Sequence, residues 1–232
     1  MKRAVVIPTH NESGNIGELV ARLRELQYDV LVVDDRGTDD TAAIVAALAE
    51  RDAAIHLIAR VDRRGYASAL QEGWRWALDH GYEQIGQMDA DGNHDPAALP
   101  ALFRLLDDAD LAIGSRYCAG GTTPDFGFVR RAMSRLAGVC ARWFLSLPLT
   151  DPTAGFRTWR AELLRRVLSA SLVSEGFVVL VESAWLSHKF GATIREAPIV
   201  FRARKAGKSN LSMAIALEWF RVVVRLRRRA IE

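Results

Sequence analysis

The pattern that decides the fold is clearest in the stretch Gln84-Ile85-Gly86-Gln87-Met88-Asp89-Ala90-Asp91-Gly92-Asn93. A short run that ends in turn-forming residues is typical of a strand, so we expect a strand over Gln84–Asp89. Side chains alternate along a strand, so the carboxylates of Asp89 and Asp91 would point in one direction. Two such oxygen ligands suit Mg²⁺ or Mn²⁺, which could hold a diphosphate through its remaining positions. A plain turn is the alternative interpretation, because Asp, Gly and Asn favour turns.

The same pattern recurs through the first 115 residues, where apolar runs alternate with helical patterns. The expected strands are Ala4–Pro8, Val30–Asp34, Ala54–Ile58, Gln84–Asp89 and Leu111–Ser115. Apolar residues at helical spacing separate these strands, which predicts βαβ units and a mostly parallel sheet in an α/β fold. Ligands gather at the carboxyl ends of such strands. The polar segments Pro8–Glu12, Asp34-Asp35 and Asp89–Asn93 all lie at these ends.

The second half of the chain has a different pattern. We expect a loop at Tyr117–Phe128, a helix over Arg130–Ser146, a break at Pro148–Gly155, a helix over Val178–Lys189, a strand over Ala192–Phe201 and a basic loop at Arg202–Asn210. A last helix over Ser212–Ala230 would carry apolar residues on one face and arginines on the other. The sequence contains no internal repeat, so we expect a single domain over residues 1–232.

Composition narrows the class of protein. Half of the 232 residues are apolar and a quarter are charged, which is ordinary for a folded domain, and no apolar run approaches the roughly 20 residues of a membrane span. Cys118 and Cys140 form no metal-binding pattern, which favours a reduced, cytosolic compartment. Residues 1–115 carry 11 Lys and Arg against 20 Asp and Glu, and residues 116–232 carry 20 against 8. The basic half suits phosphates or an anionic membrane surface, whereas no motif indicates a nucleic-acid partner.

Several motifs together resemble a known family. Val5–Glu12, Val32–Thr41 and Asp89–Asn93 resemble the nucleotide-sugar half of glycosyltransferases of the GT-A fold, in the inverting family two. The second half is similar to the dolichol- or polyprenol-phosphate mannosyltransferases, at Gly114–Tyr117, Gly120-Gly121, Arg130, Ser134, Asp151–Arg157, Gly176-Phe177, Glu182, Glu196–Ile199, Phe201–Arg204 and Gly207–Ser209. The resemblance implies a Rossmann-like, mostly parallel sheet flanked by helices, with amphipathic helices of the C-terminal half at the membrane surface.

The resemblance also implies roles for individual residues. The donor nucleotide sugar would contact Pro8, Thr9, His10, Glu12, Val33, Asp35, Asp89, Ala90 and Asp91. A Mg²⁺ or Mn²⁺ ion would be held by Asp89, Asp91 and Asn93. The acceptor and its phosphate would contact Arg116, Arg130, Asp151, Arg204 and Ser209, because guanidinium groups grip phosphate oxygens bidentately. The catalytic set would be Asp91, Arg116, Arg130 and Arg204.

The implied reaction is a metal-dependent, inverting transfer of a hexose, with mannose from GDP-mannose expected first, to the phosphate of a polyprenol. The alternatives are another nucleotide sugar of the UDP-glucose type, a different acceptor, or a catalytically silent nucleotide-binding scaffold. Departures from the family pattern at His10, Arg36-Gly37, Asn93 and Asn210 leave the donor sugar and the acceptor open. Residues 1–115 would form the nucleotide-sugar half and residues 116–211 the acceptor half. The helices Arg130–Ser146 and Ser212–Ala230 would lie peripherally at the cytoplasmic face of a membrane.

Overall fold

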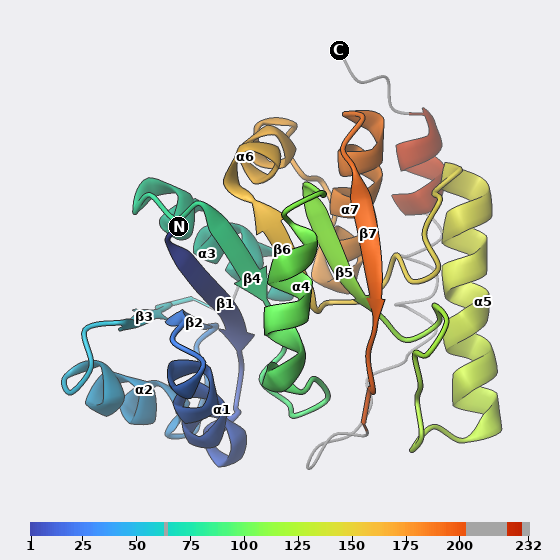
Figure 1. Cartoon of the computed structure of the whole chain (residues 1–232). Helices are drawn as coiled ribbons and strands as arrows, with labels where there is room; N and C mark the ends of the chain where they lie inside the picture. Colours follow the sequence, from blue (N-terminus) through green and yellow to red (C-terminus); the bar gives the residue numbers. More distant parts are fainter. Residues whose placement is uncertain (63–64, 203–221, 229–232) are drawn as a thin grey trace.

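A computed structural model describes residues 1–62, 65–202 and 222–228 of the chain (Figure 1). One seven-stranded sheet with the order β3-β2-β1-β4-β6-β5-β7 forms the centre of the fold. Its strands are β1 (Arg3–Thr9), β2 (Asp29–Asp34), β3 (Ile55–Ala59), β4 (Gln84–Gln87), β5 (Leu111–Ser115), β6 (Arg157–Arg160) and β7 (Ile194–Pro198). All neighbouring pairs run parallel except those made by β6, which is antiparallel to both β4 and β5.

Helices cover both faces of this sheet. They are α1 (Ser13–Glu25), α2 (Thr41–Ala49), α3 (Tyr66–Asp79), α4 (Leu99–Leu105), α5 (Phe128–Leu145), α6 (Ala161–Ser169) and α7 (Val179–Lys189), with short 3₁₀ turns η1 (Pro96–Ala98) and η2 (Gly176–Val178). Alternate residues of β1 and β2 enter two separate cores, one shared with α1, α2 and α4 and the other with α3, α6 and α7. Strands buried on both faces explain the nearly continuous apolar runs of the sequence.

The predicted α/β class and mostly parallel sheet are confirmed, with differences in detail. The strand expected over Gln84–Asp89 ends at Gln87, so the assumption that Asp89 and Asp91 alternate along a strand is wrong. The strand β6 and the helices α4 and α6 were not predicted. The strand expected over Ala192–Phe201 is confined to Ile194–Pro198.

Residues 222–228 pack against the rest of the domain. Residues 222–228 are helical, and Val223 and Leu226 are fully buried in the core that includes the end of α5. Figure 1 shows this short segment beside α5, where the Arg227 guanidinium donates to the Phe144 carbonyl. In this part of the predicted Ser212–Ala230 helix, the side chains of Val223 and Leu226 are therefore buried in the protein interior. Among the described residues, no helix is long and apolar enough to cross a membrane.

Candidate active site

The carboxyl ends of β1 and β2 lie side by side, as the sequence predicts. Their register pairs Pro8 with Val33 and Thr9 with Asp34, and Asp35 follows at once. Val33 itself is fully buried in the core under α3, so only its backbone is near this edge of the sheet.

The two adjacent acids after β2 have different partners. Asp34 shapes its own turn, since it accepts hydrogen bonds from the Thr9 hydroxyl and from the backbone N–H of Gly37, at 3.1 and 3.0 Å. Asp35 is buried and accepts from the Arg60 guanidinium at 2.7 Å and from the backbone N–H of Gly65 at 2.8 Å. Asp35 is thus the acid that ties β2 to the segment after β3. No role was predicted for Arg60 from the sequence, although Arg60 directly follows β3.

His10 and Glu12 continue the same edge beyond β1. The His10 Nδ1 lies 3.1 Å from the backbone carbonyl of Asp35, and because a carbonyl only accepts, Nδ1 carries the proton. Glu12 precedes α1; its backbone N–H donates to the Thr41 hydroxyl and its carboxylate accepts from the Asn15 amide. These contacts place both side chains within the loops that link β1, α1 and α2.

The Asp89–Asn93 segment forms a tight turn after β4. Asp91 is buried and accepts from the backbone N–H of Asn93 at 3.1 Å and from the Asn93 side-chain amide at 2.7 Å. This orientation leaves the Asn93 Oδ1 as a buried oxygen without a hydrogen-bond partner among the described residues. A buried acceptor in that state is costly unless a ligand meets it, and a carboxylate beside an amide oxygen suits a hard divalent cation. The described residues hold no group of three or more His, Cys, Asp or Glu side chains arranged for a metal.

Asp89 accepts a hydrogen bond from a tyrosine, Tyr66, for which the sequence predicted no role. The Tyr66 hydroxyl, at the start of α3, donates to the Asp89 Oδ1 at 2.9 Å. Burial, together with the charge of Asp89, raises the pKa of Tyr66 well above its usual value, so the hydroxyl stays a donor. On the backbone side, the N–H of Asp89 donates to the Nδ1 of His94. Burial lowers the pKa of His94 to about 4, and its neutral ring stacks on Phe156 at 4.9 Å.

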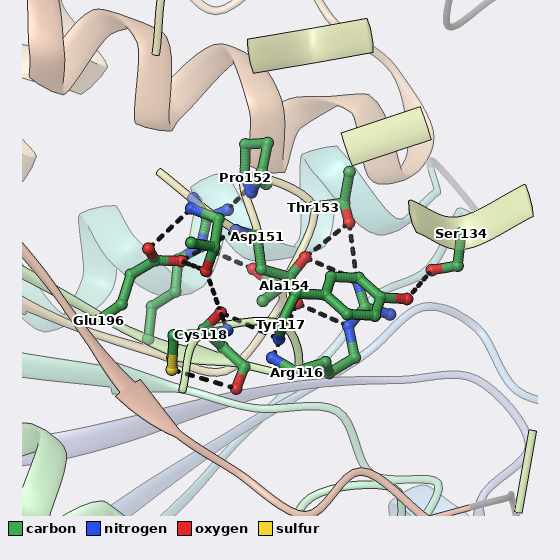
Figure 2. A network of polar contacts seen from close by, with 12 residues as sticks. Arg116, Tyr117, Cys118, Ser134, Asp151, Pro152, Thr153, Ala154 and Glu196 are labelled. Carbon is green, nitrogen blue, oxygen red and sulfur yellow. Dashed lines mark hydrogen bonds and ion pairs between the residues drawn. The ribbon is translucent and has the colours of Figure 1, made fainter. Parts of the chain in front are cut away.

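Arg116 and Asp151 form a buried ion pair at the end of β5 (Figure 2). The Arg116 Nε and Nη2 donate to the two Asp151 oxygens at 2.7 Å each, and Nη2 also donates to the Thr153 hydroxyl. Although burial opposes the charge on each group, their hydrogen bonds and mutual attraction lower the pKa of Asp151 and raise that of Arg116. Among the described residues, no hydrogen bond involves the Arg116 Nη1. Two of the five acceptor-side residues predicted from the sequence, Arg116 and Asp151, are therefore in contact.

A second carboxylate holds the loop that carries Asp151. Glu196 on β7 accepts from the backbone N–H groups of Thr150 and Asp151 and from the Thr150 hydroxyl, at 2.7 to 2.9 Å. Since the Thr150 proton is given to Glu196, the Ser115 hydroxyl, 2.7 Å away, must donate to Thr150. Figure 2 shows how this network joins the end of β5 and Glu196, in the middle of β7, to the Asp151 loop.

Comparison with known proteins identifies the family. The family model described as glycosyl transferase family 2 matches residues 4–168. The chain belongs to glycosyl transferase family 2. Two curated relatives are each 36% identical to it. One is the undecaprenyl-phosphate mannosyltransferase of Micrococcus luteus, matched over 94% of this chain and 90% of the relative, and the other is the polyprenol monophosphomannose synthase of Mycolicibacterium smegmatis, matched over 90% and 80%.

Solved structures agree on the fold of this family 2 glycosyltransferase. Glucosyl-3-phosphoglycerate synthase of Mycobacterium tuberculosis, in a complex with Mn²⁺ and UDP, has a TM-score of 0.68 at 20% identity and covers 97% of this chain and 78% of its own. Mannosyl-3-phosphoglycerate synthase of Rubrobacter xylanophilus gives 0.65 at 17% identity, covering 98% and 73%. At these identities the likeness concerns the GT-A fold. The predicted family, GT-A fold and enzyme class are confirmed, while the interfacial amphipathic helices of the C-terminal half stay a prediction.

The glycosyltransferase has another buried arginine, Arg157, which ends the motif Asp151–Arg157 but received no role from the sequence. Arg157 is fully buried and donates to the carbonyls of Pro152, Ala154 and Leu180 and to the Ser183 hydroxyl. Burial lowers the pKa of Arg157 to about 10. Its guanidinium hydrogen bonds to Pro152 and Ala154 stabilise the turn between Asp151 and β6. Arg157 therefore fixes the same loop that Glu196 binds through Thr150 and Asp151.

Some predicted site residues cannot be placed. Arg204 and Ser209 lie outside the described residues, and Arg130 is in α5 with its side chain outside them. Of the acceptor-side residues, the structure describes Arg116 and Asp151. Ala90 is buried in the core with α4, so it contributes backbone to this part of the fold.

Proposed function

We propose that this glycosyltransferase transfers mannose from GDP-mannose to the phosphate of a polyprenol, with inversion at the sugar and with a divalent ion, Mg²⁺ or Mn²⁺. The observation that carries the proposal is the likeness over 90% or more of the chain to two enzymes whose names specify mannosyl transfer with an undecaprenyl phosphate or a polyprenol. Two features of the structure support it: acids gather at one edge of the sheet, and the buried Arg116–Asp151 ion pair lies at the end of β5.

On the donor side, residues 1–115 would bind the nucleotide sugar. His10, Glu12 and Asp35 lie around the carboxyl ends of β1 and β2 and would contact the base and ribose. Asp89, Asp91 and Asn93 would hold the divalent ion, because the buried Asn93 Oδ1 beside Asp91 fits an oxygen-binding cation. When bound, the ion supplies positive charge that stabilises the leaving diphosphate.

On the acceptor side, residues 116–211 would position the polyprenyl phosphate. A phosphate is already an anion near neutral pH, so it can attack without a general base. The task left to the protein is to orient this anion. Asp151 holds Arg116 through its Nε and Nη2, and no hydrogen bond from a described residue involves Nη1. Arg130, Arg204 and Ser209 would complete the phosphate contacts, and Asp151 acts through Arg116 rather than as a base.

The test is transfer from a panel of labelled nucleotide sugars to polyprenyl phosphate in detergent, with Mg²⁺, with Mn²⁺ and with chelator. We expect GDP-mannose to be the best donor, chelator to abolish transfer, and Asp91→Ala to lose it. Asp95→Ala is a matched control, because Asp95 lies just after this segment but is exposed, pairs with Arg22 and caps the following turn. Full transfer by Asp91→Ala would refute the proposed metal site. Transfer only from UDP-glucose would replace the donor, and nucleotide binding without turnover would favour the scaffold.

The proposal also places the enzyme peripherally at the cytoplasmic face of a membrane, through α5. Met133, Leu136, Val139 and Trp143 recur at helical spacing, and each of these side chains is more than half exposed. Arg135 and Arg142 are exposed on the same helix. An apolar stripe of this kind beside arginines is typical of a helix that lies in a membrane interface. At the end of α5, Trp143 is exposed, Phe144 is half-buried and Leu145 is buried.

Flotation with anionic liposomes tests this surface. We expect the full chain to float with the vesicles and the double variant Leu136→Ser/Trp143→Ser to remain behind. Val61→Ser is the control, because Val61 is as exposed as Trp143 but lies after β3, away from α5. Equal flotation of all three proteins would show that α5 is not the membrane contact.

A further inference from the structure

Tyr66 and the residue before it bridge two strand ends of the donor side. The backbone N–H of Gly65 donates to Asp35 after β2, and the Tyr66 hydroxyl donates to Asp89 after β4. Two consecutive residues at the start of α3 thus contact the acid expected at the nucleoside and the first acid expected at the metal. Neither Gly65 nor Tyr66 has a role in the proposed reaction so far.

The Tyr66 hydroxyl is held in place by its surroundings. Its ring packs against Phe177 of η2, with centroids 4.4 Å apart. On the other side, a Cβ at Gly155 would lie 3.1 Å from the Tyr66 hydroxyl and 3.3 Å from the Asp89 Oδ2. The Gly155 backbone is itself fixed, because its carbonyl accepts from the Gln87 amide at the end of β4. Glycine at position 155 therefore lets the loop close over the Tyr66–Asp89 pair.

We propose that Tyr66 is a positioning residue that sets the orientation of the Asp89 carboxylate for the divalent ion. This inference rests on the metal site of the proposed function. A hydrogen bond to one oxygen has two opposed effects on a ligand: it withdraws charge from the carboxylate, which weakens binding, and it restricts rotation, which strengthens binding. Partners of metal ligands generally act in the second sense, and their removal costs roughly 10- to 100-fold in metal affinity.

The Tyr66→Phe variant removes the hydroxyl and keeps the ring against Phe177. Tyr82→Phe is the matched control. The Tyr82 hydroxyl also donates to an aspartate, Asp29 at 2.7 Å, but Asp29 begins β2 and so lies at the opposite edge of the sheet. Both variants lose one tyrosine–aspartate hydrogen bond, so any general loss of stability should be shared between them.

The measurement is the affinity for Mn²⁺ in the presence of GDP, from the electron paramagnetic resonance signal of free Mn²⁺, together with calorimetry of GDP binding in chelator. We expect Tyr66→Phe to weaken Mn²⁺ binding by about 10-fold or more, with GDP binding in chelator unchanged. Tyr82→Phe should match the wild type in both. Gly155→Ala, which presses on the same pair from the other side, should also weaken Mn²⁺ binding.

The outcomes separate this inference from the proposed function. If the wild type binds Mn²⁺ with GDP and Tyr66→Phe does so equally well, the role of Tyr66 is refuted while the metal site stands. If the wild type itself takes up no Mn²⁺ with GDP, the metal site and the role of Tyr66 are both overturned. An equal loss in Tyr66→Phe and Tyr82→Phe would mean that general destabilisation is the cause, and would also refute the positioning role.

Discussion

Replacing Asp151 with asparagine should destabilise the protein strongly, because it leaves a buried charge without its partner. The Arg116 side chain is 11% exposed and that of Asp151 is fully buried, so neither group recovers water when the pair is broken. In Asp151→Asn, an amide would face the Nε–H and the backbone N–H of Arg116, which both donate to Asp151 Oδ2 in the wild type. Breaking a buried pair from one side typically costs about 3–5 kcal/mol. We therefore expect a loss of about 3 kcal/mol or more in the free energy of unfolding.

An exposed pair provides the comparison. The Arg22–Asp95 pair has a short contact of 2.5 Å, but its side chains are 42% and 59% exposed. Water and salt screen such a pair, so its removal costs about 0–1 kcal/mol. Asp95→Asn should thus be nearly neutral despite the shorter distance. Urea unfolding followed by tryptophan fluorescence measures both variants, since Trp74, Trp159 and Trp185 are buried reporters.

The double variant Arg116→Met/Asp151→Asn tests the cause. If the cost comes from an uncompensated charge, removing the arginine as well should recover part of the stability that Asp151→Asn loses. A double variant that is less stable than Asp151→Asn by the full cost of Arg116→Met alone would show that the two groups are not coupled. A loss below about 1 kcal/mol in Asp151→Asn would likewise refute the reasoning.

Three further predictions concern other parts of the fold. Gly73→Ala should lower the melting temperature, because the new Cβ would lie 2.4 Å from the Val6 Cγ1. Overpacking of this kind costs about 1–3 kcal/mol, and we expect that cost to exceed the gain of roughly 1 kcal/mol in helix propensity. Burial alone would raise the pKa of Asp39, but hydrogen bonds from Thr41 and Ser13 outweigh it and lower the pKa from 3.8 to about 2. The ionised Asp39 therefore stabilises the fold above pH 4, and this contribution is lost as the pH falls towards 2. Unfolding curves of Asp39→Asn should therefore differ most from the wild type at neutral pH and converge in acid. Glu196→Gln offers one acceptor oxygen to three donors, so it should lose about 1–3 kcal/mol by the same assay and reduce transfer.

The sequence predicted the donor side of the sheet well because that information is local. Buried parallel strands are continuous apolar runs, so Ala4–Pro8 and Leu111–Ser115 were found almost to the residue. The acids that follow β2 and β4, Asp35 and Asp89, are visible in the sequence because they end such runs. The partners of those acids are not, because Arg60 meets Asp35 and Tyr66 meets Asp89 only after the strands are placed side by side. A strand of only four residues such as β6, which begins and ends with arginine, gives no apolar run to detect.

The strand that the sequence missed is also the one that completes the site. The strands β4 and β5 run parallel to each other, so a parallel strand between them would bring its exit loop to the active edge and its entry loop to the opposite edge. Because β6 is antiparallel to both, with Gln87 at the end of β4 paired to Arg157 at the start of β6, its entry loop arrives at the active edge instead. That loop carries Asp151, which meets Arg116 at the end of β5, and Gly155, which closes over Asp89 after β4. The reversal of this one strand therefore brings the predicted donor and acceptor residues to the same edge of the sheet.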